Sequence, residues 1–138
     1  MKKIFFLLSI TAACLSFISC EYDDLSTLKG TTWEFSVSGS EALEWVYFYY
    51  PISANPNVTY TITFQFTTET EIKYFDRVKG VAYGEKVNEI IDSGMGTYIY
   101  DEKEGLVTIC DEVCIDAKIS KNKLTFTENG VSVVLTKK

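Results

Sequence analysis

The side chains that could do chemistry in this chain are its cysteines and carboxylates. Its 138 residues include four cysteines, 19 acidic residues and no histidine. Without histidine the chain cannot form a Ser–His or Cys–His nucleophile pair, and it lacks the commonest metal ligand. It also has no glycine-rich phosphate loop, and no pattern places two carboxylates at the separation that a glycosidase needs. We therefore predict a protein that is not an enzyme and that uses no metal or cofactor.

The motif with the most evident chemistry is Cys110-Asp-Glu-Val-Cys114. The alternation before it is that of a strand, and a three-residue loop would place Cys110 opposite Cys114 in the returning strand. Facing residues lie within the distance that a disulfide needs, and an exported location favours one. Two free thiols, or a metal or redox site, remain open as alternatives, although two sulfurs fall short of the four ligands of structural zinc.

A third cysteine, Cys20, stands where the chain changes character abruptly. Two lysines precede an uncharged apolar run over residues 4–18, and acidic residues begin directly after Cys20. The run is short for a membrane-spanning helix and has the proportions of an export signal. With the small residue Ser19 before it, Cys20 resembles the acylated cysteine of bacterial lipoproteins. Cys14 is a second candidate, and an uncleaved N-terminal membrane helix is the alternative.

This resemblance divides the chain into a lipoprotein signal peptide (1–19), a lipidated tether (20–30) and a folded domain (31–138). The membrane is then a partner through the acyl anchor, which needs no spanning helix. An acidic cluster after the lipidated cysteine resembles the surface-export signal of Bacteroidetes-type lipoproteins, which implies the bacterial outer membrane and exposure at its surface. The net charge of −6, with no basic run, argues against a nucleic-acid partner.

Alternating apolar and polar residues predict that β-strands position these side chains. Over residues 60–67, Tyr60, Ile62, Phe64 and Phe66 share one face, while threonines and a glutamine share the other. Residues 71–75 offer Ile72 and Tyr74 as the next inward pair, after a polar turn. These segments therefore read as strands with one buried face.

Two hairpins have a register that the sequence itself specifies. An Asn-Gly dipeptide at residues 129–130 favours a type I′ turn, and a two-residue loop there pairs Phe126 with Val133. A four-residue loop at residues 102–105 pairs Tyr98 with Ile109. Both pairs are apolar and lie on one face, which a wrong register would not allow.

About eight strands can be counted, joined by short turns and with no helical crossover. Residues 85–91 are ambiguous between a helix and an irregular strand. Sequential hairpins with one apolar face must close on themselves or stack as two sheets. We predict an all-β fold, a single antiparallel up-and-down barrel of about eight strands.

Two short motifs resemble a known family. The stretch LKGTTW at residues 28–33, a Gly and then a Trp opening the first strand, looks like small lipocalin-like domains in lipoproteins of gut Bacteroidetes-type bacteria. The segment GTYIYDEKEGLVTI at residues 96–109 is similar to their middle hairpins. The resemblance covers most of residues 25–137. It implies a lipocalin-like β-barrel in a lipoprotein context, and such folds often bind small apolar ligands.

Aromatic side chains supply the candidate binding residues. The stretch WVYFYY at residues 45–50 is apolar on both faces, so one face can line the barrel and the other needs a cover. That cover is either a packed loop over residues 51–57, or a sugar or protein partner. The predicted ligand-binding residues are Trp45, Tyr47, Tyr60, Phe64, Tyr74, Tyr98 and Tyr100.

Two functions follow from these patterns. The first is a lipid-anchored cell-envelope protein that binds a small apolar molecule or a glycan inside the barrel. The second is a protein-interaction module at the cell surface that uses an exposed aromatic patch around residues 45–50. A ligand carrier should contain a cavity of at least about 300 Å³, whereas an interaction module should have a filled interior and a large exposed apolar patch.

Overall fold

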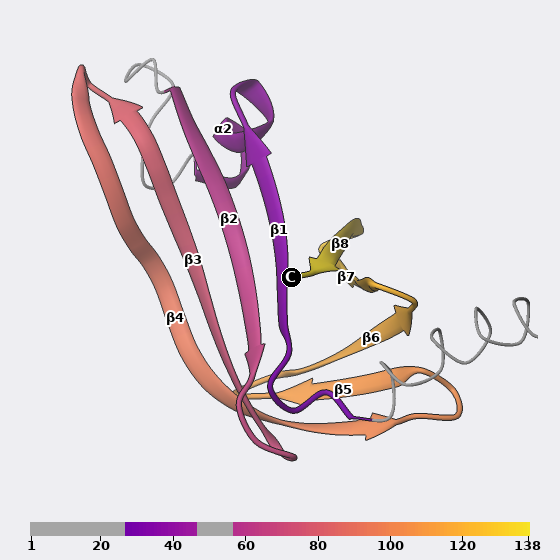
Figure 1. The fold of residues 1–138 in the computed structure, drawn as a ribbon. Coiled ribbons are helices and arrows are strands. Elements are labelled where there is room, and N and C mark those ends of the chain that lie inside the picture. Colours follow the sequence, from indigo (N-terminus) through magenta and orange to yellow (C-terminus); the bar gives the residue numbers. More distant parts are fainter. Residues whose placement is uncertain (1–26, 47–56) are drawn as a thin grey trace, which may run out of the picture.

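The computed structural model describes residues 27–46 and 57–138. In chain order its elements are β1 (Thr32–Ser38), α2 (Ser40–Val46), β2 (Asn57–Phe66), β3 (Glu71–Ala82), β4 (Glu85–Asp101), β5 (Leu106–Cys110), β6 (Cys114–Ser120), β7 (Lys123–Glu128) and β8 (Val131–Lys137). Each strand pairs antiparallel with the next, and β8 returns to β1 to close the barrel (Figure 1). The predicted all-β up-and-down barrel of eight strands is confirmed.

The predicted hairpin registers are also confirmed. Phe126 pairs with Val133 across the Asn-Gly turn, whose two residues have φ angles of 49° and 80°, as a type I′ turn requires. Tyr98 pairs with Ile109 in the β4–β5 hairpin. Cys110 lies opposite Cys114 in the β5–β6 hairpin. Local alternation and turn chemistry were enough to specify these three pairings.

One helix was not expected. Trp45, which the apolar pattern placed in a barrel strand, lies instead on the short helix α2. Ala42 and Val46, four residues apart, are both buried and anchor one face of this helix against the barrel. Gly39 precedes the helix with a φ of 67°, a left-handed conformation that lets the chain leave β1 sharply. Seven residues are too few for periodicity to distinguish a helix from an apolar strand.

The ambiguous residues 85–91 belong to β4, which has 17 residues and pairs with β3 through its residues 85–97. The register shifts at one point, where Asp76 pairs with Asp92 but the next residue, Arg77, pairs with Ile90. The extra residue, Ile91, forms a β-bulge. The bulge explains why simple alternation was unclear in this part of the sequence.

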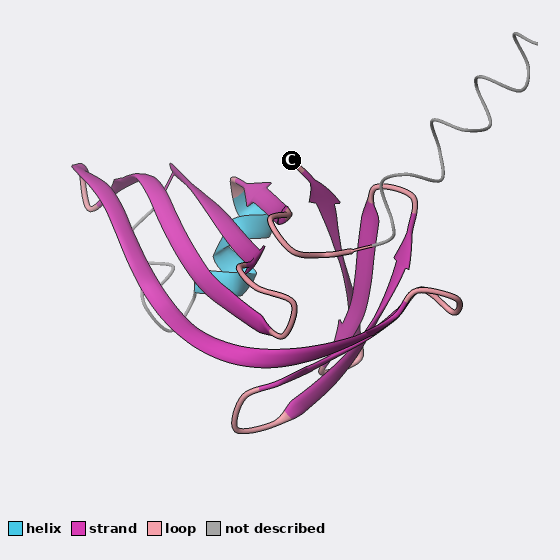
Figure 2. Ribbon diagram, turned by 60° about the horizontal axis from the view of Figure 1, so that its bottom comes forward, coloured by secondary structure: helices cyan, strands magenta, loops and turns pink. Residues whose placement is uncertain are grey.

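The barrel is closed firmly at one end only. Strands β2, β3 and β4 have 10, 12 and 17 residues, whereas β5 to β8 have between 5 and 7. The seam between β1 and β8 contains only two residue pairs, Trp33 with Lys137 and Glu34 with Thr136. The long sheet therefore extends past the short one and diverges from it (Figures 1 and 2). This mismatch in strand length leaves the other end open.

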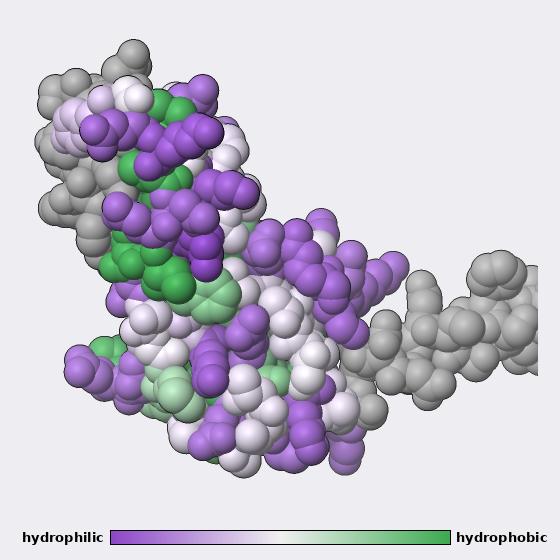
Figure 3. Space-filling model, turned by 60° about the vertical axis from the view of Figure 1, so that its left-hand side comes forward, coloured by the Kyte–Doolittle hydropathy of each residue, from purple (hydrophilic) through white to green (hydrophobic). Residues whose placement is uncertain are grey.

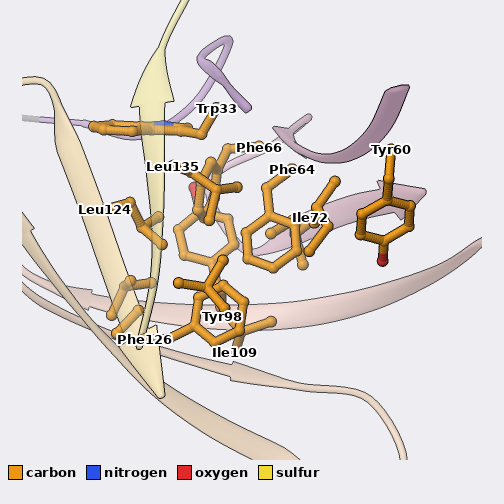
Figure 4. Packing of buried hydrophobic residues seen from close by; sticks show 14 of the residues in the cluster. Trp33, Tyr60, Phe64, Phe66, Ile72, Tyr98, Ile109, Leu124, Phe126 and Leu135 are labelled. Atoms are coloured by element: carbon orange, nitrogen blue, oxygen red, sulfur yellow. The ribbon is translucent and has the colours of Figure 1, made fainter. Parts of the chain in front are cut away.

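Trp33 is the centre of the closed end. Its side chain is 1% exposed, and its indole Nε1 donates a hydrogen bond to Thr31 Oγ1 over 2.9 Å. Leu28, in the segment before β1, is also buried in this core. Figure 4 shows Trp33 lying across the apolar cluster, with Tyr60 at its far side. The packed domain thus includes Leu28, slightly ahead of residue 31.

The outer face of β3 and β4 carries isolated apolar side chains. Ile90, Met95 and Ile99 are each more than half exposed. In the space-filling view from this side, apolar residues alternate with hydrophilic ones (Figure 3). Within residues 27–46 and 57–138, no helix has the length and hydropathy needed to cross a membrane.

Candidate functional site

A cavity of about 1020 Å³ occupies the open end of the barrel. Side chains from α2 and from every strand except β1 reach it, together with residues of the β5–β6 and β7–β8 turns. Its lining residues are Glu44, Trp45, Tyr60, Ile62, Phe64, Tyr74, Asp76, Asp92, Ser93, Gly94, Ile109, Asp111, Glu112, Val113, Ile115, Phe126, Glu128, Asn129 and Val131. The volume exceeds the roughly 300 Å³ at which ligand sites begin.

One wall of the cavity is aromatic. The Trp45 ring stacks on Tyr60, with centroids 5.5 Å apart and an interplanar angle of 18°. Phe35 of β1 packs against Trp45 from the side, at 5.3 Å. Deeper in the barrel, Phe64 and Phe126 stack at 5.7 Å from opposite parts of the sheet. The helix therefore adds a ring to a wall that the strands alone would leave incomplete.

Beside this aromatic wall, on the neighbouring strand β3, lies the carboxylate of Asp76. Tyr60 Oη donates a hydrogen bond of 2.5 Å to Asp76 Oδ2, so a carboxylate is joined directly to the aromatic wall. The β-bulge sets Asp92 opposite Asp76 in the neighbouring strand, and directly opposed residues have side chains about 5 Å apart. Glu128 reaches the same region from the end of β7. Asp76 and Asp92 thus lie on neighbouring strands of the cavity wall, and Glu128 approaches from β7, across the barrel.

Burial raises the pKa of Asp76 from 3.8 to about 6. The negative charges of Asp92 and Glu128 act in the same direction, because they disfavour a third charge nearby, while the hydrogen bond from Tyr60 opposes the shift. The same surroundings raise the pKa of the Tyr60 hydroxyl, mainly through burial and then through its bond to Asp76. At neutral pH the Asp76 carboxylate is therefore charged, although its burial and its acidic neighbours destabilise that charge.

We expect Asp76→Asn to stabilise the protein at pH 8 and to stabilise it only about a third as much at pH 4.5. The folded state binds a proton at Asp76 more tightly than the unfolded state does, so wild-type stability falls as pH rises from about 4 to about 6. Asparagine removes the charge and keeps an oxygen that accepts the Tyr60 hydrogen bond. After allowance for partial solvent screening, the gain at pH 8 should be roughly 1–2 kcal/mol in urea unfolding.

The matched control is Glu102→Gln, which removes one charge from an exposed turn outside the cavity. It should give nearly the same free energy of unfolding as wild type at both pH values. A gain of equal size at pH 4.5 and pH 8 for Asp76→Asn would show that charge at Asp76 is not the cause.

The β5–β6 turn, residues 111–113, forms another part of the cavity wall. A disulfide joins Cys110 and Cys114, and the three residues between them line the cavity. Tyr74 Oη donates a hydrogen bond to Asp111 Oδ2, which raises the pKa of Tyr74 to about 12. Gly94 leaves room for this ring, because a Cβ at position 94 would lie 2.2 Å from Tyr74 Oη. The disulfide thus constrains a loop that forms part of the cavity wall.

The structure brings together four of the seven predicted ligand-binding residues: Trp45, Tyr60, Phe64 and Tyr74 all line the cavity. Tyr98 lies instead in the filled end, where its ring packs edge-on against Phe66 and its hydroxyl bonds to the Thr68 carbonyl. Tyr100 packs against the core without lining the cavity. Tyr47, and the predicted lipidation site Cys20, lie outside the described residues.

Sequence reasoning missed the cavity carboxylates. Asp76 was detectable, because it continues the inward alternation of Ile72 and Tyr74 on β3. Glu128 likewise continues the inward series that contains Phe126 on β7. Asp92 could not be found in this way, because the bulge at Ile91 changes the alternation of β4. An acidic residue at an inward strand position is therefore the sequence signal that indicates a polar cavity in such a barrel.

In the described part of the chain, no three acidic or cysteine side chains come together in a cluster suited to a metal ion. The cavity carboxylates are instead spread around its walls. Comparisons with protein-family models, with curated proteins and with solved structures found no match for this chain. The function of the cavity therefore has to come from its own shape and chemistry.

Proposed function

We propose that this protein is a lipid-anchored binding protein of the bacterial cell envelope, and that it holds a small molecule in the open end of its barrel. The observation that carries the proposal is the cavity of about 1020 Å³ with aromatic rings on its walls. Ligand sites are typically concave and mostly apolar, with a few polar groups that orient the ligand. This cavity combines stacked rings with hydrogen-bonded side chains such as Tyr60 and Asp76.

The proposed location comes from the N-terminal sequence. The apolar run followed by Ser19 and Cys20 resembles a lipoprotein signal, and the acidic residues after it resemble a surface-export signal. An acyl chain on Cys20 would tether the barrel at the outer membrane, where small molecules of the envelope and its surroundings can reach the cavity. The motifs at residues 28–33 and 96–109, which resemble those of lipocalin-like lipoproteins, support the same location.

The alternative, a protein-interaction module built on an exposed patch around residues 45–50, has less support. Trp45 is packed between Phe35 and Tyr60 in the cavity wall. The contacts of the Trp45 ring therefore belong to the cavity wall. The remaining members of that patch, residues 47–50, lie outside the described residues.

The binding proposal predicts that the full chain takes up N-phenyl-1-naphthylamine, a neutral dye that becomes fluorescent in apolar sites. Trp45→Ala should weaken dye binding by about 3- to 10-fold, because it removes one ring of a stacked pair. The matched control is Tyr83→Ala, which removes an exposed ring at the β3–β4 turn, outside the cavity. Titration of dye fluorescence measures both affinities.

Absence of saturable dye binding to the wild-type chain would contradict the proposal. So would an equal loss of affinity in Tyr83→Ala, because the dye would then bind outside the cavity. Circular dichroism of each variant checks that the barrel is intact before affinities are compared.

A further inference from the structure

The walls of the cavity carry negative charge and no positive charge among the described residues. Six carboxylates line it, and the described lining contains neither lysine nor arginine. Asp76 is half-buried, whereas the other five are exposed. The six are Glu44, Asp76, Asp92, Asp111, Glu112 and Glu128.

The ion pairs seen among residues 27–46 and 57–138 do not involve the cavity carboxylates. The described ion pairs join Lys29 to Glu69 and Lys138 to Glu34, and neither reaches the cavity. Asp76 and Asp92 face each other in the ladder, and like charges in that position destabilise a sheet. The repulsion is consistent with the raised pKa of Asp76. A cation in the cavity would remove it.

Aromatic faces lie beside the same carboxylates. The Trp45 and Tyr60 rings form one wall, and Tyr60 is itself hydrogen-bonded to Asp76. Ring faces attract ammonium and guanidinium groups, and the attraction strengthens when water is excluded. A ligand with a cationic head and an apolar body could therefore place its head near Asp76 and its body along the rings of Phe64 and Phe126.

We propose that the cavity selects an organic cation, an ammonium or guanidinium group carried on an aromatic or aliphatic body. This inference rests on the proposed binding function and names the chemical class of its ligand. A bare metal ion fits less well, because the carboxylates are dispersed and the site has a large apolar wall. An anionic ligand would meet six like charges.

Three naphthyl compounds of similar shape and one small cation test the contributions of the ligand's charge and of its apolar body separately. They are 1-naphthylmethylammonium, the neutral 1-naphthylmethanol, the anionic 1-naphthoate and methylammonium, which has the charge without the ring. Calorimetric titration of the full chain should give tighter binding of the naphthyl ammonium than of the alcohol, by at least about tenfold. Naphthoate and methylammonium should bind more weakly than the naphthyl ammonium.

Charge-removing variants then locate the selectivity. The double variant Asp76→Asn, Glu128→Gln should reduce the preference for naphthylmethylammonium over naphthylmethanol, the ratio of their affinities, by about tenfold. The matched control combines Glu102→Gln with Glu85→Gln, which removes two charges outside the cavity. That control should change neither affinity by more than about twofold, because distant exposed charges are largely screened.

The possible outcomes distinguish a failure of the cation preference from a failure of the proposed binding function. If naphthylmethanol binds as tightly as the ammonium, the cavity is a binding site but does not select cations, and only this inference fails. The same holds if the control double variant loses as much affinity as the cavity variant, because the preference would then be a general effect of net charge. If no naphthyl probe binds, both the inference and the proposed function fail.

Discussion

Trp33→Ala is expected to lower the free energy of unfolding by about 3–5 kcal/mol, the range for removing a buried aromatic side chain. Trp33 is 1% exposed and belongs to one of the two residue pairs that join β1 to β8. Its loss would leave a void at the closed end and weaken the seam of the barrel. Since small domains are stable by only about 5–15 kcal/mol, this change should remove a large part of the total.

The chain provides a matched control, because its other tryptophan lies at the open end. Trp45→Ala should cost only about 1 kcal/mol, since that ring is partly exposed and borders an open cavity. Urea unfolding followed by far-ultraviolet circular dichroism measures both variants without relying on tryptophan fluorescence. A loss for Trp45→Ala as large as that for Trp33→Ala would mean that the closed end is not the main source of stability.

Cys20→Ala is expected to abolish acylation and to release the protein from the membrane. Each buried methylene contributes about 0.8 kcal/mol to membrane binding, and stable anchoring needs more than one chain. If Cys20 is the acceptor, as we propose, its loss removes every acyl chain rather than one of them. Incorporation of labelled fatty acid, followed by fractionation of membranes, measures the effect in a bacterial host that processes lipoproteins.

Cys14→Ala is the control for this prediction, since Cys14 is the other cysteine of the N-terminal segment. It should still incorporate label and fractionate with the membrane. Label retained in Cys20→Ala and lost in Cys14→Ala would move the acceptor to Cys14. Label retained in both single variants would contradict the lipoprotein interpretation at both positions.

Much of the barrel could be predicted because its information is local. The side chains of a strand alternate between two faces, so residues 60–66 reveal their buried face directly. A two-residue Asn-Gly loop allows one register, and that register paired Phe126 with Val133. Each of these inferences needed only residues that are close together in the chain.

Helix α2 and the bulge in β4 were harder to predict, because residues close together in the chain do not settle either of them. The helix has seven residues, so its two buried residues, Ala42 and Val46, make a pattern that an apolar strand can also show. At the bulge, one extra residue changes the phase of β4 and moves Asp92 to the inner face. Which strand bulges depends on the partner strand, and the partner is not visible in a short window.

Taken by itself, the sequence determined the strand pattern, the hairpin registers and the absence of histidine chemistry, since composition and alternation are properties of the chain alone. Only the tertiary structure decided that the barrel is filled around Trp33 and open around Tyr60. That difference arises because long β2–β4 face short β5–β8 across the barrel, and because β1 meets β8 in only two pairs. The same long-range closure places Asp76, Asp92 and Glu128 around one cavity together with aromatic rings.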